Sequence, residues 1–286
     1  MQRHTRLNWT STSAIRLALL FSRVVNGAEL RPETAHAWGE YLATANARMI
    51  DRTHGGFLWI DEPDERLWRV RAGEIVVAPM RTKMPITVPH GLVHHWIGAL
   101  FLRGAHLDEV IARLREYDRY GEFYAPAVKN VQVIERDSNP HRARDRFTVT
   151  LANESLFSKR ALESEYASQY TPLDSHRSYL LCQSVRVQEW SEYGTAKQHK
   201  LHPGEGSGYL WEIATISRFQ ERDSGVYLEM EAIALSRDVP LQLRFLVDPI
   251  IRRIAASTLT ASLQETQKAV EMRVETATLR DKVGGL

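Results

Sequence analysis

Residues 208–240 read GYLWEIATISRFQERDSGVYLEMEAIALSRDVP, and this stretch decides the fold class. Two runs that alternate apolar and polar residues flank the turn sequence Asp223-Ser224-Gly225, so the stretch predicts a β-hairpin. One face of the first strand carries Tyr209, Trp211, Ile213, Thr215 and Phe219, and one face of the second carries Val226, Leu228, Met230, Ala232 and Ala234. A sheet with one apolar face needs a second layer that buries it.

The chain before this hairpin is predicted to hold two helices followed mainly by strands. Helical spacing and end signals predict helices at 31–50 and 61–73, then a strand at 73–80 and one long β segment from Thr87 to Leu102. A further helix at 105–126 ends in a group of aromatic residues, Tyr117, Tyr120, Phe123 and Tyr124. Alternating runs at 128–137, 144–152, 159–172 and 177–190 predict more antiparallel strands.

The C-terminal part is predicted to be helical, with a break. One apolar stripe comprises Leu243, Leu246, Val247, Ile250, Ile251 and Ile254, and a second comprises Leu259, Leu263, Thr266 and Val270. At about 100° per residue the stripes are out of phase across residues 255–257, so we expect a kink there, with Ser257 as the cap of the second helix. This helix is the layer that would cover the apolar face of the sheet.

The order of elements resembles the START-like (helix-grip, SRPBCC-type) superfamily, and specifically an uncharacterised bacterial group within it. The resemblance is carried by HHWIGALF (94–101), YDRYGEFYAP (117–126), the hairpin through SRDVP, and the terminal LVDPIIRRI and TLTASLQET. It implies an α+β helix-grip fold, in which a curved antiparallel sheet wraps around a long C-terminal helix, with a mixed helix/strand N-terminal extension. The expected divisions are an N-terminal arm or signal at 1–28, the extension at 29–90, the START-like domain at 91–270 and a tail at 271–286.

The resemblance also implies a hydrophobic cavity, and it carries no catalytic residues. The ligand-binding residues that we expect are Phe123 and Tyr124 at the cavity mouth, Tyr166, Tyr170, Trp211, Thr215 and Met230 on the strands, and Leu259 and Leu263 on the C-terminal helix. Aromatic rings with a polar tip suit a rim that is apolar inside and wet outside. The alternative is that the same side chains pack directly against the helix and leave no cavity.

Other residue patterns give little support to catalysis or metal binding. Glu229 and Glu231 could act as an acid–base pair, but a solvated outer face, with Arg186 or Arg218 as partner, is the simpler interpretation. His90 and His94 lie on one strand face, about 13 Å apart, which is too far for one metal ion, and His95 points the other way. Cys182 lies in the middle of a strand, which is typical of an inert buried thiol.

Composition excludes several classes of protein. The net charge of the 286-residue chain is only +2, which gives no sign of a nucleic-acid partner. Its single cysteine excludes an internal disulfide framework and a cysteine-based zinc site. Residues 1–28 hold arginines, the apolar run LALLF and the small pair Gly27-Ala28, which is the order of a secretory signal peptide, although Arg23 interrupts it. We therefore expect a periplasmic or secreted protein; the alternative is a cytoplasmic protein with a disordered or helical N-terminal arm.

The sequence thus favours a non-enzymatic protein that binds or carries a hydrophobic small molecule, with a lipid as the simplest ligand. We expect no cofactor and no transmembrane segment, while transient contact with a membrane is compatible with this function. Two alternatives stay open: a cyclase- or hydrolase-like enzyme that uses the same cavity, and a structural or interaction protein with a filled core. Fold alone does not choose among them.

Overall fold

The computed structural model describes residues 28–62, 64–138, 143–155 and 158–284. The predicted signal segment therefore lies outside the described residues, apart from Ala28. Within the described part, no helix is apolar over a length that would cross a bilayer.

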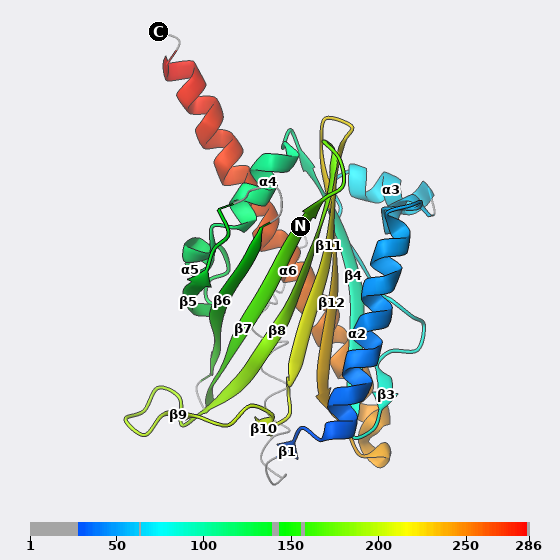
Figure 1. Ribbon diagram of the computed structural model, residues 1–286, viewed down its shortest axis with the longest axis vertical. Coiled ribbons are helices and arrows are strands. Elements are labelled where there is room, and N and C mark those ends of the chain that lie inside the picture. The colour runs from blue at the N-terminus through cyan, green and yellow to red at the C-terminus, as the bar shows by residue number, and fades with distance from the viewer. Residues whose placement is uncertain (1–27, 63, 139–142, 156–157, 285–286) are drawn as a thin grey trace, which may run out of the picture.

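A ten-stranded antiparallel sheet forms the body of the molecule (Figure 1). Its main order is β2 (Val76–Pro79), β4 (Gly91–Arg103), β12 (Gly225–Arg237), β11 (Glu212–Arg222), β8 (Arg177–Ser191), β7 (Ser158–Pro172), β6 (Arg144–Ser155) and β5 (Val128–Glu135). Two short strands, β3 (Ile86–Val88) and β9 (His199–Lys200), pair with β4 and β8, while β1 (Ala28–Glu29) pairs separately with β10 (Glu205–Gly206). Residues before Gly91 thus supply two strands of the same sheet as the residues after it.

The predicted hairpin is present as β11 and β12. Its strands pair from Glu212 with Leu235 down to Arg222 with Gly225. Asp223 and Ser224 form the turn, and both have positive φ angles, 56° and 60°. Two such residues in succession match the right-handed twist of the flanking strands, which makes this a tight hairpin connection.

The predicted single β segment from Thr87 to Leu102 is wrong, because it is two strands. β3 and β4 form a hairpin in which Val88 pairs with Gly91. The turn between them holds Pro89, which cannot donate a ladder hydrogen bond, and His90, whose φ is 54°. This turn reverses the chain where the apolar pattern alone indicated continuous strand.

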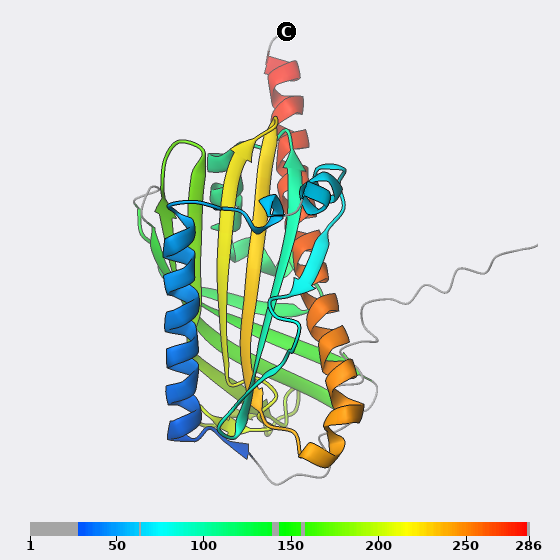
Figure 2. The ribbon, with the colours of Figure 1, turned by 90° about the vertical axis from the view of Figure 1, so that its right-hand side faces the viewer.

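Two long helices lie on either side of β4, β11 and β12 (Figure 2). Helix α2 (Pro32–Arg52) packs Trp38, Ala45 and Met49 on one face, which we call the outer face. Helix α6 (Leu241–Gly284) covers part of the opposite, inner face with Leu259 and Leu263, and both side chains are buried as predicted. The antiparallel sheet and its long C-terminal helix confirm the predicted α+β helix-grip fold.

A glycine lets α6 approach the sheet closely. A Cβ atom on Gly98 of β4 would lie 2.5 Å from Cδ1 of Leu263 and 3.3 Å from Cδ2 of Leu259. Real Cβ atoms do not come as close to a carbon as the first of these distances, so any side chain at residue 98 would displace the helix or its leucines. Helix α6 therefore packs directly against the backbone of Gly98.

The predicted break in the C-terminal helix is wrong. Helix α6 runs without interruption from Leu241 to Gly284, and its last turns project beyond the sheet (Figure 1). Ser257 is not a cap; its hydroxyl donates to the carbonyl oxygen of Ile254 within the helix, at 3.0 Å. Ala255 and Ala256 are strong helix formers, so backbone hydrogen bonding continues although the apolar stripe changes phase.

The remaining helices are short. Helix α3 (Asp64–Arg71) follows a single 3₁₀ turn at Trp59–Asp61. Helix α4 (Leu107–Leu114), a 3₁₀ turn at Tyr117–Arg119 and helix α5 (Tyr120–Phe123) connect β4 to β5. Helix α4 and α5 both contact α6, so the aromatic residues of this connection come close to the C-terminal helix.

Candidate functional site

The inner face of the sheet has short side chains in its centre. Strand pairing places Ser168 of β7 opposite Cys182 of β8, Cys182 opposite Thr215 of β11, and Thr215 opposite Ala232 of β12. The neighbouring row across the same strands contains Tyr170, Leu180, Ser217, Met230 and Gly98. We call these two rows the floor. The first row carries only short side chains on these four strands and ends at Trp96 of β4, which lies opposite Ala232. Short side chains leave room above the sheet that long ones would fill.

On β11 and β12 the floor keeps accessible surface at several positions, whereas the outer-face residues between them do not. On β12, Met230, Ala232 and Ala234 are half-buried, and the residues between them, which point to the outer face, are fully buried. Thr215 of β11 is half-buried as well, between buried Ala214 and Ile216. Helix α6 lies mainly along β4 and β2, at one side of the floor. On β11 and β12, the side of the sheet that faces α6 is therefore the less completely packed one.

Titratable groups at the floor are nevertheless deep in protein. Burial raises the pKa of the Cys182 thiol to about 12, although the hydroxyl of Thr215 hydrogen-bonds to it. Burial also raises the pKa of the Tyr166 hydroxyl above its usual value. Both side chains are surrounded by protein and still retain accessible surface. The thiol is protonated at neutral pH, so Cys182 is not a reactive nucleophile.

Aromatic rings form one wall beside the floor. Tyr117 stacks on Phe147 of β6, with ring centroids 4.1 Å apart, and Phe147 stacks on Tyr166 of β7 at 5.5 Å. Tyr120 meets Tyr124 edge to face at 5.1 Å. The hydroxyl group of Tyr124 lies 3.0 Å from that of Thr266, on α6. The aromatic cluster thus spans the distance between the sheet and the C-terminal helix.

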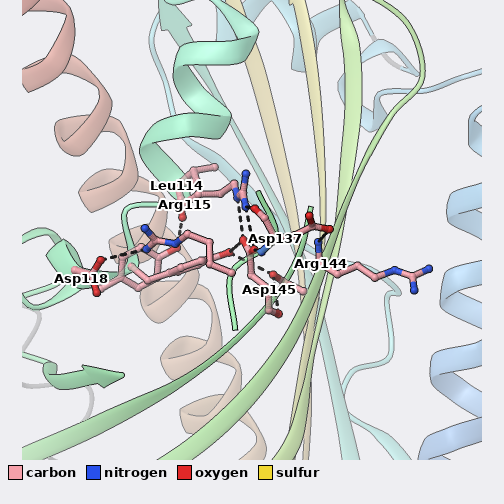
Figure 3. A network of polar contacts seen from close by, with 10 residues as sticks. Leu114, Arg115, Asp118, Asp137, Arg144 and Asp145 are labelled. Carbon is pink, nitrogen blue, oxygen red and sulfur yellow. Dashed lines mark hydrogen bonds and ion pairs between the residues drawn. The ribbon is translucent and has the colours of Figure 1, made fainter. Parts of the chain in front are cut away.

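Asp145 of β6 holds one end of this wall through hydrogen bonds (Figure 3). Its carboxylate accepts hydrogen bonds from Nε and Nη2 of Arg115, at 2.8 and 2.9 Å, and from the hydroxyl of Tyr117 at 2.8 Å. The backbone N–H of Asp137 donates to it as well, at 2.9 Å. Asp145 is buried. It was missed from the sequence, although an acidic residue in phase with apolar Phe147 and Val149 was a usable signal.

The expected ligand-binding residues lie in different parts of the structure. Tyr170, Thr215 and Met230 lie at the floor, and Tyr124 and Tyr166 belong to the aromatic wall. Leu259 and Leu263 fill the contact of α6 with Gly98. Phe123 is buried under two guanidinium groups, with its ring centroid 4.4 Å from Cζ of Arg113 and 4.8 Å from Cζ of Arg119.

The placement of Trp211 on the inner face is wrong. Its side chain belongs to the cluster of buried residues on the outer face, with Trp38 and Leu235. The ordered strand begins at Glu212, and the backbone N–H of Trp211 donates to the carbonyl of Leu235 at 2.8 Å. The alternation that relates Thr215 to Phe219 therefore does not extend back to Trp211.

Glu229 and Glu231 are not on a solvated face; they are buried below α2. Arg218, one of the two predicted partners, donates Nε to Glu229 at 2.8 Å and Nη1 to Glu231 at 2.6 Å. Arg186, the other, pairs with Glu165. Nε2 of His95 lies 2.8 Å from Glu231, and the hydroxyl of Tyr41 lies 2.9 Å from Nδ1 of His95.

Burial alone would raise the pKa of Glu231, but the hydrogen bond to His95 and the charge of Arg218 lower it to about 2. The carboxylate of Glu229 also accepts the backbone N–H of Ile60, at 2.9 Å. Both carboxylates are committed to partners on the outer face. Neither reaches the floor, so they cannot serve as an acid–base pair there.

The three histidines lie in separate environments. His90 is in the exposed β3–β4 turn, His95 is in the outer-face network, and His94 points to the inner face, where its Nε2 lies 2.9 Å from Oγ of Ser236. Burial lowers the pKa of His94 to about 4, so it is neutral at physiological pH. Among the described residues there is no group of three or more potential metal ligands.

Comparisons with known proteins add likeness of structure but none of sequence. No protein-family model matches the chain, and no curated protein is significantly similar to it. Among solved structures, a STAR-related lipid transfer protein fragment from Xanthomonas axonopodis has 11% identity and a TM-score of 0.44, over 68% of this chain and 98% of that one.

Two further solved structures are similar. Human STARD10 has 10% identity and a TM-score of 0.43, over 77% of this chain and 82% of its own. The Zhui aromatase/cyclase from Streptomyces sp. R1128 has 14% identity and a TM-score of 0.36, over 64% and 96%. At such low identity these likenesses assign no activity, ligand or partner to this chain.

Proposed function

We propose that this protein binds a hydrophobic small molecule, with a lipid as the simplest candidate, in the space between the floor and α6. The observation that carries the proposal is that Thr215, Met230 and Ala232 keep accessible surface on the face that α6 covers only in part, while the residues beside them on the outer face of β11 and β12 are buried. A filled core would bury these three floor positions as well.

The size of the expected affinity follows from apolar burial. A chain of about 12 methylenes gains on the order of 10 kcal/mol on burial, at about 0.8 kcal/mol for each methylene. Association costs remove a large part of this gain, so a dissociation constant in the micromolar range is expected. The enzymatic alternative loses its named acid–base pair, because Glu229 and Glu231 lie under α2.

The test is a binding titration with a filled-floor variant. Ala232→Phe places a ring over the floor, and Ala35→Phe adds the same ring at an exposed position of α2. cis-Parinaric acid is titrated into the full chain, with its fluorescence as the readout. We expect saturable binding by the wild type and by Ala35→Phe, and at least tenfold weaker binding by Ala232→Phe. Absence of saturable binding of both cis-parinaric acid and its methyl ester by the wild type, or equal binding by all three proteins, would contradict the proposal.

A further inference from the structure

The floor offers hydrogen-bonding groups without charge. Its members include the hydroxyl groups of Ser168, Thr215 and Ser217 and the thiol of Cys182, next to the hydroxyl of Tyr166. The hydroxyl of Thr215 is hydrogen-bonded to the thiol of Cys182, which lies opposite it on β8. A thiol is a weak acceptor, so this hydroxyl would gain from a stronger one. An apolar molecule that lies on the floor therefore meets a hydrogen-bond donor, the hydroxyl of Thr215, at the centre of the floor.

The described inner-face positions around this donor carry no Asp, Glu, Lys or Arg, although the carboxylate of Glu212 accepts a hydrogen bond from one of them, Ser184, at 2.5 Å. They are Ser164, Tyr166, Ser168 and Tyr170 on β7, Ser178, Leu180, Cys182 and Ser184 on β8, Ile213, Thr215, Ser217 and Phe219 on β11, Leu228, Met230, Ala232 and Ala234 on β12, and Trp96, Gly98 and Leu100 on β4. His94, the next position on β4, is neutral at physiological pH. The carboxylate of Asp145 lies on β6, the strand next to β7, and is already paired with Arg115. An anion brought to the floor would lose its hydration and find no positive partner among these inner-face positions. A cation would meet there only the carboxylate of Glu212, which Ser184 already contacts and whose pKa burial raises.

We infer that the ligand is an uncharged molecule with an apolar body and an oxygen acceptor, such as a carbonyl, which receives the hydroxyl of Thr215. This inference rests on the proposed function, and it narrows the ligand from hydrophobic molecules in general to neutral oxygen-bearing ones. Fatty acids and phospholipids would have to keep their charged groups outside the floor. Beside the floor, the half-buried ring of Tyr166, which stacks on Phe147, offers an aromatic surface for a ring system.

The inference can be tested with two ring systems that differ in one carbonyl group. Fluorene and fluorenone are titrated into the full chain, with quenching of tryptophan fluorescence as the readout. A net hydrogen bond between neutral groups corresponds to about a twofold to tenfold change in affinity. We expect the wild type to bind fluorenone more tightly than fluorene by that factor. Thr215→Val should remove this preference, so that the two compounds bind equally tightly, while Thr215→Ser, which keeps the hydroxyl, should retain it.

A second pair of probes tests the requirement for neutrality. cis-Parinaric acid and its methyl ester share one chain and differ in charge, so the ester should bind at least as tightly as the acid at neutral pH. Equal affinity for fluorene and fluorenone, a preference that persists in Thr215→Val, or failure of both rings to bind would overturn the inference. So would tighter binding of the acid than of the ester. In these cases saturable binding of either parinaric probe would leave the proposed function intact, whereas the proposed function falls as well if no probe binds.

Discussion

The contact of Gly98 with Leu263 allows a prediction in which two harmful substitutions partly cancel. Leu263 is fully buried, so Leu263→Ala should cost about 2–5 kcal/mol of unfolding free energy, through lost burial and the space left behind. Gly98→Ala adds a Cβ atom that would lie 2.5 Å from Cδ1 of Leu263 and 3.1 Å from Cγ2 of Val77. Overpacking of this kind costs about 1–3 kcal/mol.

The double variant removes the clash that the alanine at residue 98 creates. Leu263→Ala deletes the Cδ1 atom with which the new methyl group would collide, and the methyl group occupies part of the space that the leucine leaves. Residues in direct contact show coupling energies of about 0.5–3 kcal/mol. We therefore expect the double variant to be more stable than the sum of the two single losses predicts, by about 1–2 kcal/mol.

Urea unfolding of the four proteins, followed by circular dichroism, measures all of these quantities. The midpoints give the losses provided that the slope of free energy against urea stays constant. As a control, Gly39→Ala changes an exposed glycine of α2 near which an added Cβ meets nothing within 4 Å. If the stability losses of Gly98→Ala and Leu263→Ala were strictly additive in the double variant, or if Leu263→Ala were as stable as the wild type, the close packing of α6 against Gly98 would be refuted.

Three further predictions concern other parts of the chain. The pKa of Glu231 is about 2 in the folded protein, below its ordinary value near 4.5. The contribution of this carboxylate to stability is therefore complete above about pH 4.5 and is lost as the pH falls towards 2. Glu231→Gln should flatten this part of the curve of unfolding free energy against pH, and an unchanged curve would contradict the prediction. Because the pKa of Cys182 is about 12, iodoacetamide at pH 8 should modify the thiol only after unfolding, as mass spectrometry can show, and rapid modification of the folded chain would refute this. If residues 1–28 are an export signal, Leu20→Arg should retain the protein in the cytoplasm of the expressing cell, and a cytoplasmic wild type with intact Met1 would exclude export.

The sequence predicted those features that depend on local periodicity. The hairpin around Asp223-Ser224-Gly225 and the burial of Leu259 and Leu263 follow from alternation and from helical spacing, and both are present. The export signal stays a prediction. The continuous course of α6 through Ala255 was not predicted, because a change of apolar phase was given more weight than the helix propensity of the residues themselves.

Features that depend on tertiary contacts were beyond the sequence. Glu229 and Glu231 alternate with apolar residues as solvated carboxylates do, and only the docking of α2 shows that their face is buried. The pairing with Arg218 was foreseen, because opposite charges on adjacent strands often meet. For the floor, the sequence gives short side chains on separate strands, but their alignment into one row depends on pairing register, which single-strand patterns do not contain.

The charged network under α2 has a consequence for any attempt to isolate the part of the chain from residue 91 onward. Such a fragment would keep Arg218, Glu229 and Glu231 but lose the hydroxyl of Tyr41, the thioether of Met49 and the amide of Ile60, which now contact this network or its histidine. It would also leave the row of Val93, Ile97 and Ile233 open to water. An excised domain of that kind would expose an apolar sheet face with a solvated cluster of charged residues at its centre, and it would be prone to self-association. Expression and crystallisation trials should therefore begin no later than Pro32, the first residue of α2.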